Sequence, residues 1–186
     1  MTPIRLLLAV VLPSLSAFGP GCAVSEPRLP AEARQLPHAV LLRDGKGRKR
    51  HLHIAPVVDG GKLASGFGLR RHPMGGGGVR HEGIDISAPE GAAVRAAAGG
   101  YVVEMGWRGS YGRFIRIRHS DRLETAYAHL RRFARGLGVG RRVKQDAVIG
   151  YVGTTGRSTR PHLHFEIRRR DRPVDPLDLP RAAGGR

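Results

Sequence analysis

The sequence lacks several features that define large classes of protein. No apolar run reaches the roughly 18 residues that a transmembrane helix needs, so we expect no ordinary membrane-spanning helix. Only 5% of the residues are aromatic, which leaves few rings on which nucleic-acid bases can stack. The chain has a single cysteine, Cys22, which excludes an internal disulfide.

Acidic residues are scarce beside basic ones. The chain has 15 Asp and Glu against 32 Lys and Arg, and its formal net charge is +17. Such a surface attracts polyanions, whether nucleic acid, anionic lipid or acidic wall polymers. The basic residues are spread over residues 28–172, and the shortage of aromatic residues opposes nucleic-acid binding. We therefore expect attraction to anionic surfaces and no nucleic-acid partner.

Glycine is abundant, and its distribution predicts an all-β fold. The 186 residues include 27 glycines, about twice the usual share of roughly 7%, and are 40% hydrophobic, which suits one globular domain. From Gly60 onward, glycines separate short strand-like segments: AAVRAA (92–97), GYVVEMGW (100–107), RFIRIRHS (113–120), LETAYAHL (123–130), AVIGYVG (147–153) and HLHFEIRR (162–169). Two of them alternate apolar and polar residues strictly. We predict a mainly antiparallel sheet, with one helical turn at residues 130–137.

The first 58 residues differ in composition from the rest. Residues 1–22 are typical of an export signal, with an apolar run at 6–12 before Cys22, and they resemble a bacterial lipoprotein signal. That resemblance implies lipidation of Cys22 and a periplasm-facing lipoprotein of the outer membrane; plain secretion and an incidental cysteine are the alternatives. The organisation that we expect is a signal (1–22), a flexible tether (23–37), N-terminal strands or a hairpin (38–58), a main domain (59–180) and a tail (181–186).

Two histidine pairs have the pattern His-x-His. On a strand, residues two apart lie on the same face, so His162 and His164 can reach one metal ion while Leu163 packs into the core. The pattern alone is weak evidence, because His51 and His53 repeat it beside a basic run and fit an exposed strand equally well.

Three further residues are candidates for metal chemistry. His81 and Asp85 are suitable zinc ligands, and Gly83 between them favours a loop that enters a strand over a helix. A hydrogen bond within that loop is the alternative. His129 lies in a strand-like segment, where strict alternation places it on the face of Tyr127, opposite Ala128.

Taken together, these motifs resemble the M23, or LytM-type, zinc metallopeptidases over residues 56–179. The resemblance is carried by GFGLRRHP (66–73), HEGID (81–85), GYVVEMGW (100–107), YGRFIRIRH (111–119), YAHL (127–130), IGYVGTTGRSTRPHLHFEI (149–167) and DPLDL (175–179). An HxxxD, a later YAHL and a terminal PHLHFE in that order form a specific signature.

The resemblance implies a fold, a substrate and a set of site residues. The fold is an antiparallel sheet with a groove over it, and the reaction is hydrolysis of peptide cross-links in bacterial peptidoglycan. One Zn²⁺ per domain is held by three ligands, which fall on His81, Asp85 and His164. Two histidines that are not ligands, His129 and His162, are implied to be catalytic.

One departure and one alternative accompany this resemblance. The loop at residues 74–80 carries four successive glycines at 75–78, where the family often has bulkier residues, so contacts from this loop to the substrate are in doubt. The alternative function is a LytM-type regulator without catalysis, which binds the wall or activates an amidase. The five intact site residues oppose that alternative, and neither the bond cleaved nor a need for an activator protein follows from the sequence.

Overall fold

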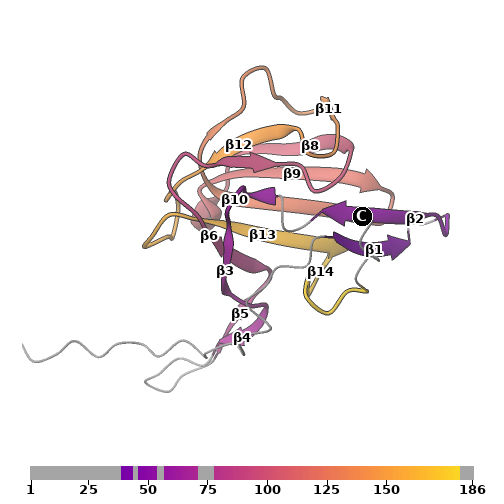
Figure 1. The fold of residues 1–186 in the computed structure, drawn as a ribbon, viewed down its shortest axis with the longest axis horizontal. Helices are drawn as coiled ribbons and strands as arrows, with labels where there is room; N and C mark the ends of the chain where they lie inside the picture. Colours follow the sequence, from indigo (N-terminus) through magenta and orange to yellow (C-terminus); the bar gives the residue numbers. More distant parts are fainter. Residues whose placement is uncertain (1–38, 44–45, 54–56, 71–77, 181–186) are drawn as a thin grey trace, which may run out of the picture.

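In the described part of the chain, one antiparallel sheet of ten strands forms the centre of the fold (Figure 1). The computed structural model describes residues 39–43, 46–53, 57–70 and 78–180. Along the sheet the strands follow the order β11 (Arg142–Val143), β8 (Gly100–Trp107), β9 (Arg113–Ser120), β10 (Leu123–Phe133), β13 (His162–Arg169), β6 (Ile84–Ser87) and β3 (Lys62–Ser65). This arrangement confirms the prediction of an all-β, mainly antiparallel fold.

Three strands extend this sheet, and two more form a small sheet beside it. Strand β12 (Val148–Val152) pairs with β10 and with β7 (Ala93–Arg95), and β14 (Arg172–Val174) pairs with β13. Strands β4 (Gly68–Arg70) and β5 (Val79–His81) pair with each other, and β5 ends just before β6 begins.

The predicted N-terminal hairpin is confirmed. Strand β1 (Ala39–Arg43) pairs antiparallel with β2 (Lys49–His53), so that Val40 lies opposite Leu52. Both of these side chains are fully buried and belong to the main hydrophobic core. The hairpin therefore packs onto the main domain as part of its core.

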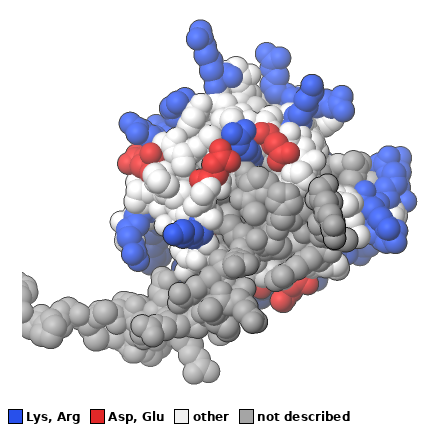
Figure 2. Space-filling view, in the orientation of Figure 1, with Lys and Arg blue, Asp and Glu red and all other residues white. Residues whose placement is uncertain are grey.

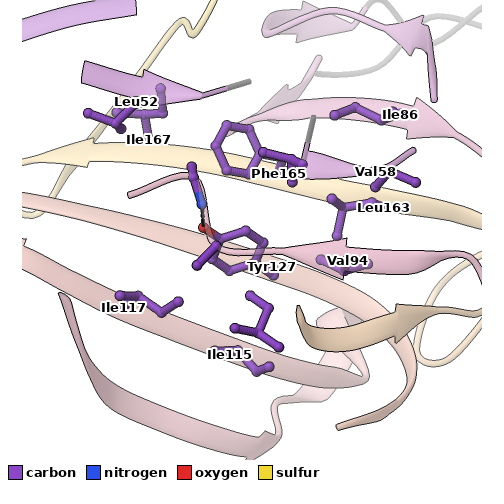
Figure 3. Close-up of a cluster of buried hydrophobic side chains, with 14 of the residues drawn as sticks. Leu52, Val58, Ile86, Val94, Ile115, Ile117, Tyr127, Leu163, Phe165 and Ile167 are labelled. Atoms are coloured by element: carbon purple, nitrogen blue, oxygen red, sulfur yellow. Dashed lines mark hydrogen bonds between the residues drawn. The ribbon is translucent and has the colours of Figure 1, made fainter. Parts of the chain in front are cut away.

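Successive side chains of β13 (His162–Arg169) point alternately into the hydrophobic core and to the opposite face of the sheet. Leu163, Phe165 and Ile167 are fully buried in the core, where Phe165 packs against the ring of Tyr127 at 5.5 Å between centroids (Figure 3). The Tyr127 hydroxyl accepts a hydrogen bond from the Ala97 N–H at 2.9 Å. Burial raises the pKa of Tyr127 to about 12, so its hydroxyl stays neutral.

The helical turn expected at residues 130–137 is wrong. Strand β10 continues to Phe133, with Leu130 paired to Val152 and Phe133 paired to Gly150 of β12. Leu130 is fully buried in the core, and this burial outweighs the local preference of its segment for a helix.

Several predictions concern segments outside the described residues. These are the export signal (1–22) with Cys22, the tether (23–37) and the tail (181–186). Among the described residues, no helix is both long enough and apolar enough to cross a membrane.

Candidate metal centre and catalytic histidines

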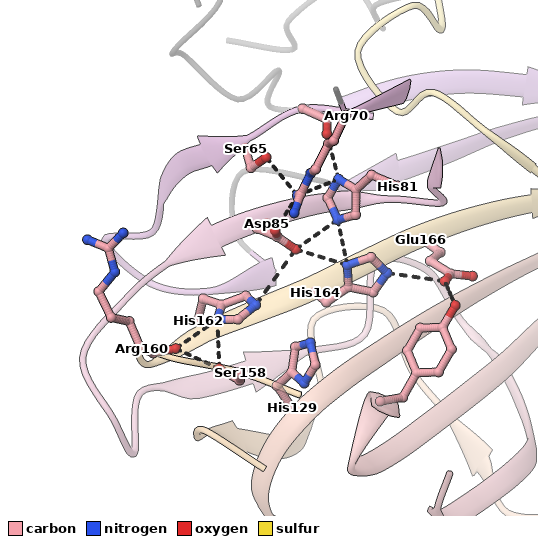
Figure 4. A network of polar contacts seen from close by, with 12 residues as sticks. Ser65, Arg70, His81, Asp85, His129, Ser158, Arg160, His162, His164 and Glu166 are labelled. Atoms are coloured by element: carbon pink, nitrogen blue, oxygen red, sulfur yellow. Dashed lines mark hydrogen bonds and ion pairs between the residues drawn. The ribbon is translucent and has the colours of Figure 1, made fainter. Parts of the chain in front are cut away.

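Three side chains from strands β5, β6 and β13 converge at one point (Figure 4). His164 of β13 lies directly opposite Asp85 of β6, and His81 ends β5. His81 Nε2 is 3.0 Å from both Asp85 Oδ1 and His164 Nδ1, and His164 Nδ1 is 2.9 Å from Asp85 Oδ1. Among the described residues, these three form the group of His, Cys, Asp or Glu side chains that can hold a metal ion.

Hydrogen bonds on the far side of the His81 and His164 rings leave one nitrogen lone pair of each ring facing Asp85. His81 Nδ1 lies 2.5 Å from the Gly66 carbonyl oxygen, which accepts a hydrogen bond from the tautomer with its proton on Nδ1; in that tautomer Nε2 carries the lone pair. His164 Nε2 lies 3.1 Å from Glu166 Oε1, so in the neutral ring Nδ1 carries the lone pair. Two lone pairs and a carboxylate oxygen meet there.

This donor set fits zinc. Zinc binds imidazole nitrogen and carboxylate oxygen at about 2.0–2.2 Å, which places two tetrahedral ligands roughly 3.3 Å apart. The three observed separations are 2.9–3.0 Å, within about 0.4 Å of that value. Because the described residues supply three protein ligands, the site has the composition of a catalytic zinc site rather than of a closed structural one.

The same residues form a strong ion pair when no cation is bound. Burial would raise the pKa of Asp85, but hydrogen bonds and charges from His164 and His81 outweigh it and hold that pKa well below its usual range. Burial would lower the pKa of His164, but its hydrogen bonds to Asp85 and Glu166 raise it to about 9. The raised pKa of His164 means that a metal ion bound through Nδ1 would have to displace a proton.

Two further histidines stand beside this group. The rings of His129 and His162 are 4.7 Å apart between centroids, and His162 Nε2 is 3.7 Å from Asp85 Oδ1. His129 Nδ1 is 2.8 Å from the Thr155 carbonyl oxygen, and His162 Nδ1 is 2.8 Å from the Arg160 carbonyl oxygen. Each backbone carbonyl binds an Nδ1 proton, which leaves the lone pair of each neutral ring at Nε2.

Burial controls the charge of His129. It lowers the pKa of His129 to about 4, although the hydrogen bond to the Thr155 carbonyl opposes this effect. His129 is therefore neutral near pH 7 and able to accept a proton.

The expectation that His129 shares a face with Tyr127 is wrong. His129 has a φ of 59°, and the register of β10 shifts between Tyr127 and Leu130 in its pairing with β9. This irregularity turns His129 away from the core and toward His162 and His164, whose ring centroids are 4.7 and 6.0 Å away. Strict alternation cannot foresee such a bulge.

Two loops meet behind His129. Gly112, with a φ of 64°, follows the short 3₁₀ helix η3 (Gly109–Tyr111) and lies against Thr155 and Gly156. Thr155 Oγ1 accepts a hydrogen bond from the Arg113 N–H at 3.0 Å and donates one to the Leu130 carbonyl at 2.8 Å. The close contact of the two glycines therefore positions the carbonyl that holds His129.

Four residues around the candidate metal ligands were not predicted from the sequence. Glu166, which is 1% exposed, contacts His164, Tyr111 Oη (2.8 Å) and Arg168 Nη1 (2.8 Å). Arg70 Nη2 lies 2.7 Å from Asp85 Oδ2 and 2.9 Å from His81 Nδ1. Alternation could have identified Glu166, since it lies two residues after His164 on the same strand. Tyr111, Arg70 and Arg168 reach the site only through tertiary structure.

Two other sequence motifs lie apart from the site. His51 is exposed on β2, and His53 Nδ1 pairs with Asp146 Oδ1 at 3.1 Å, which agrees with an exposed strand. Residues 71–77, which hold most of the glycine-rich loop, lie outside the described part of the chain.

Known proteins resemble this chain in both sequence and fold. The model of Peptidase family M23 matches residues 79–176. Over 138 residues the chain is 44% identical to the "DD-carboxypeptidase/endopeptidase Mpg" of Neisseria meningitidis, covering 73% of this chain and 31% of that protein. It is 39% identical to the "Peptidoglycan DD-endopeptidase ShyC" of Vibrio cholerae, covering 67% of this chain and 28% of that protein. The chain thus spans about a third of the length of these curated relatives.

Solved structures of similar fold include peptidases. A zinc-containing peptidase from Vibrio cholerae matches with a TM-score of 0.66 at 33% identity, over 76% of this chain and 47% of that one. The catalytic domain of lysostaphin from Staphylococcus simulans matches with a TM-score of 0.59 at 31% identity, over 67% of this chain and 96% of that one.

Proposed function

Because this chain belongs to peptidase family M23, we propose that it is a zinc metalloendopeptidase that hydrolyses peptide cross-links of bacterial peptidoglycan. The relatives named as peptidoglycan endopeptidases and the zinc-containing structural neighbour support the substrate and the metal. The chain covers only part of those relatives, so the proposal concerns the activity of this domain.

One observation carries the proposal: five side chains meet in an arrangement suited to metal-assisted hydrolysis. We assign His81 Nε2, Asp85 Oδ1 and His164 Nδ1 as zinc ligands, since these atoms lie 2.9–3.0 Å apart. His129 and His162 lie beside them and are free to act on substrate, because their Nδ1 atoms are held by backbone carbonyls.

The two histidines that are not ligands divide the proton chemistry. Zinc, when bound, polarises a peptide carbonyl and lowers the pKa of a water molecule to about 7. His129, neutral because burial lowers its pKa to about 4, accepts a proton from the attacking water and passes it to the leaving amine. His162, in its protonated form, donates a hydrogen bond to the oxyanion that develops on the carbonyl.

Zinc content and hydrolysis, measured on the same variants, test this proposal. His81→Ala and His164→Ala should each lose zinc and activity, whereas His129→Ala and His162→Ala should keep zinc and lose about 10²–10⁴-fold in hydrolysis. His51→Ala, which changes the exposed histidine of the other His-x-His pair, is the matched control and should change neither. The assay is mass spectrometry of muropeptides released from purified sacculi. Zinc binding without any release of muropeptides would indicate a regulator without catalysis instead.

We further propose that Cys22 is lipidated and anchors the protein at the periplasmic face of the outer membrane. The apolar run at 6–12 before Cys22 supports lipidation, and by analogy with bacterial lipoproteins Ala23 offers no aspartate of the kind that retains them at the inner membrane. The net charge of +17 adds attraction to anionic surfaces, and Figure 2 shows Lys and Arg at several separate places around the face in view.

Metabolic labelling with a fatty acid tests the anchor. Wild type should be labelled and stay with membranes after a high-salt wash, because salt screens charge but does not extract a lipid. Cys22→Ser should lose the label. Unlabelled wild-type protein that becomes fully soluble in the wash would show a secreted enzyme held by charge alone.

A further inference from the structure

A buried carboxylate stands directly behind one of the proposed ligands. Glu166 is 1% exposed, and its Oε1 lies 3.1 Å from His164 Nε2 and 2.8 Å from the Tyr111 hydroxyl. Its Oε2 lies 2.8 Å from Arg168 Nη1. A buried charge is costly unless it is paired and hydrogen-bonded, and both oxygens of Glu166 have such partners.

Arg168 joins Glu166 to the segment that carries the other ligands. Its Nη1 is also 3.3 Å from Glu82 Oε2, and its Nη2 donates to the Asp171 carbonyl at 2.8 Å. Glu82 follows His81 directly in the sequence, and Glu166 lies two residues after His164. One guanidinium group therefore connects the His81 segment with strand β13.

We propose that Glu166 is a positioning residue that holds the Nε2 proton of His164, so that Nδ1 presents its lone pair to the metal, and that Arg168 orients Glu166 for this task. The inference rests on the proposed zinc site. An imidazole can carry its proton on either nitrogen, and the hydrogen bond at one nitrogen decides which nitrogen is available to a metal. A hydrogen-bond acceptor next to His164 Nε2 selects the tautomer with its proton on Nε2, and only this tautomer can bind a metal ion through Nδ1.

The surroundings of Glu166 predict that glutamine is a poor replacement for it. Arg168 Nη1 and the Tyr111 hydroxyl both donate to this carboxylate, as does His164. An amide has one oxygen and one NH₂ group. If its oxygen faces His164, the NH₂ group meets the donor on Arg168; if the amide is reversed, the NH₂ group faces His164 Nε2 and favours the form with its proton on Nδ1.

Zinc affinity, measured by competition with a chromophoric chelator on the full chain, tests this inference without an activity assay. Glu166→Gln should bind zinc about 10–100-fold more weakly than wild type, the usual effect of losing such a partner. Arg168→Met in the Gln background removes the opposing donor and should recover part of that loss. Zinc affinity within twofold of wild type in Glu166→Gln, or no recovery in the double variant, would overturn the inference.

Glu124→Gln provides the matched control. Glu124 is also a buried glutamate on the sheet, 7% exposed and 2.9 Å from Arg118 Nε, and it lies opposite Arg168 in the β10–β13 pairing. It has no contact with a proposed ligand among the described hydrogen bonds and ion pairs. Glu124→Gln should therefore keep the zinc affinity of wild type even if its stability falls.

A second measurement uses the unaltered protein and does not depend on the folding of a variant. In ¹⁵N NMR spectra of the zinc-loaded wild-type chain, the His164 ring should be protonated at Nε2, with its resonance assigned through correlations from the ring to the His164 backbone. A proton on Nδ1 would overturn the inference. Failure of wild type to bind zinc at all would instead refute the proposed function, so the two failures are distinguishable.

Discussion

Replacing Gly112 with alanine should disable the site without touching any ligand or catalytic side chain. An added Cβ would lie 2.5 Å from both Thr155 Oγ1 and Gly156 N, whereas ordinary contacts lie at 3.4–4 Å. The Thr155 loop must therefore move by roughly 0.9 Å or more. The Thr155 carbonyl is 2.8 Å from His129 Nδ1, and a shift of that size takes this pair beyond hydrogen-bond distance.

The size of the effect follows from these contacts. Alanine at a φ of 64° costs about 1 kcal/mol, and losing a hydrogen bond of Thr155 costs about 1 kcal/mol more, so the free energy of unfolding should fall by roughly 2 kcal/mol. Misplacement of a catalytic group by about 1 Å can cost around 10²-fold in rate. We therefore expect hydrolysis to fall about 10²-fold while zinc content stays at that of wild type.

Gly136→Ala is the control, because it places an alanine at a positive φ without displacing any loop. Gly136 has a φ of 75°, and an added Cβ would have no atom within 4 Å. This variant should lose about 1 kcal/mol of stability and keep its activity. The measurements are urea denaturation, zinc content and the release of muropeptides from sacculi. If Gly112→Ala hydrolyses sacculi at the rate of Gly136→Ala, the reasoning about the Thr155 loop is refuted.

Two other perturbations have outcomes that the structure determines. Tyr127→Phe leaves the buried Ala97 N–H without its acceptor and should lower the free energy of unfolding by about 1–3 kcal/mol; an unchanged urea midpoint would contradict this. In zinc-free protein, the pKa of His129 is about 4 when folded against 6.5 normally, so the unfolded chain binds a proton first. The free energy of unfolding should fall as the pH drops from about 6.5 to 4, and it should fall less steeply in His129→Gln. Urea titrations of both proteins at pH 7 and pH 5 measure this difference.

The sequence by itself determined the strands and most of the candidate site. Alternation in HLHFEIRR placed His162 and His164 on one face and Leu163 on the other, and the structure agrees, because a strand sets the direction of successive side chains locally. Gly83 argued against a helix between His81 and Asp85, and they lie at the end of β5 and within β6. Backbone preference over a few residues was enough for these predictions.

Tertiary structure alone decided the features that depend on distant partners. Residues 130–137 have the local pattern of a helical turn, yet pairing with β12 and burial of Leu130 extend β10 to Phe133. His129 faces the site because the register of β10 against β9 shifts between Tyr127 and Leu130, where His129 has a positive φ. Glu166 was visible as a neighbour of His164, but its partners Tyr111 and Arg168 become evident only when loops and strands pack together. Strand pairing and burial are non-local, and where they oppose a local preference their free energy prevails.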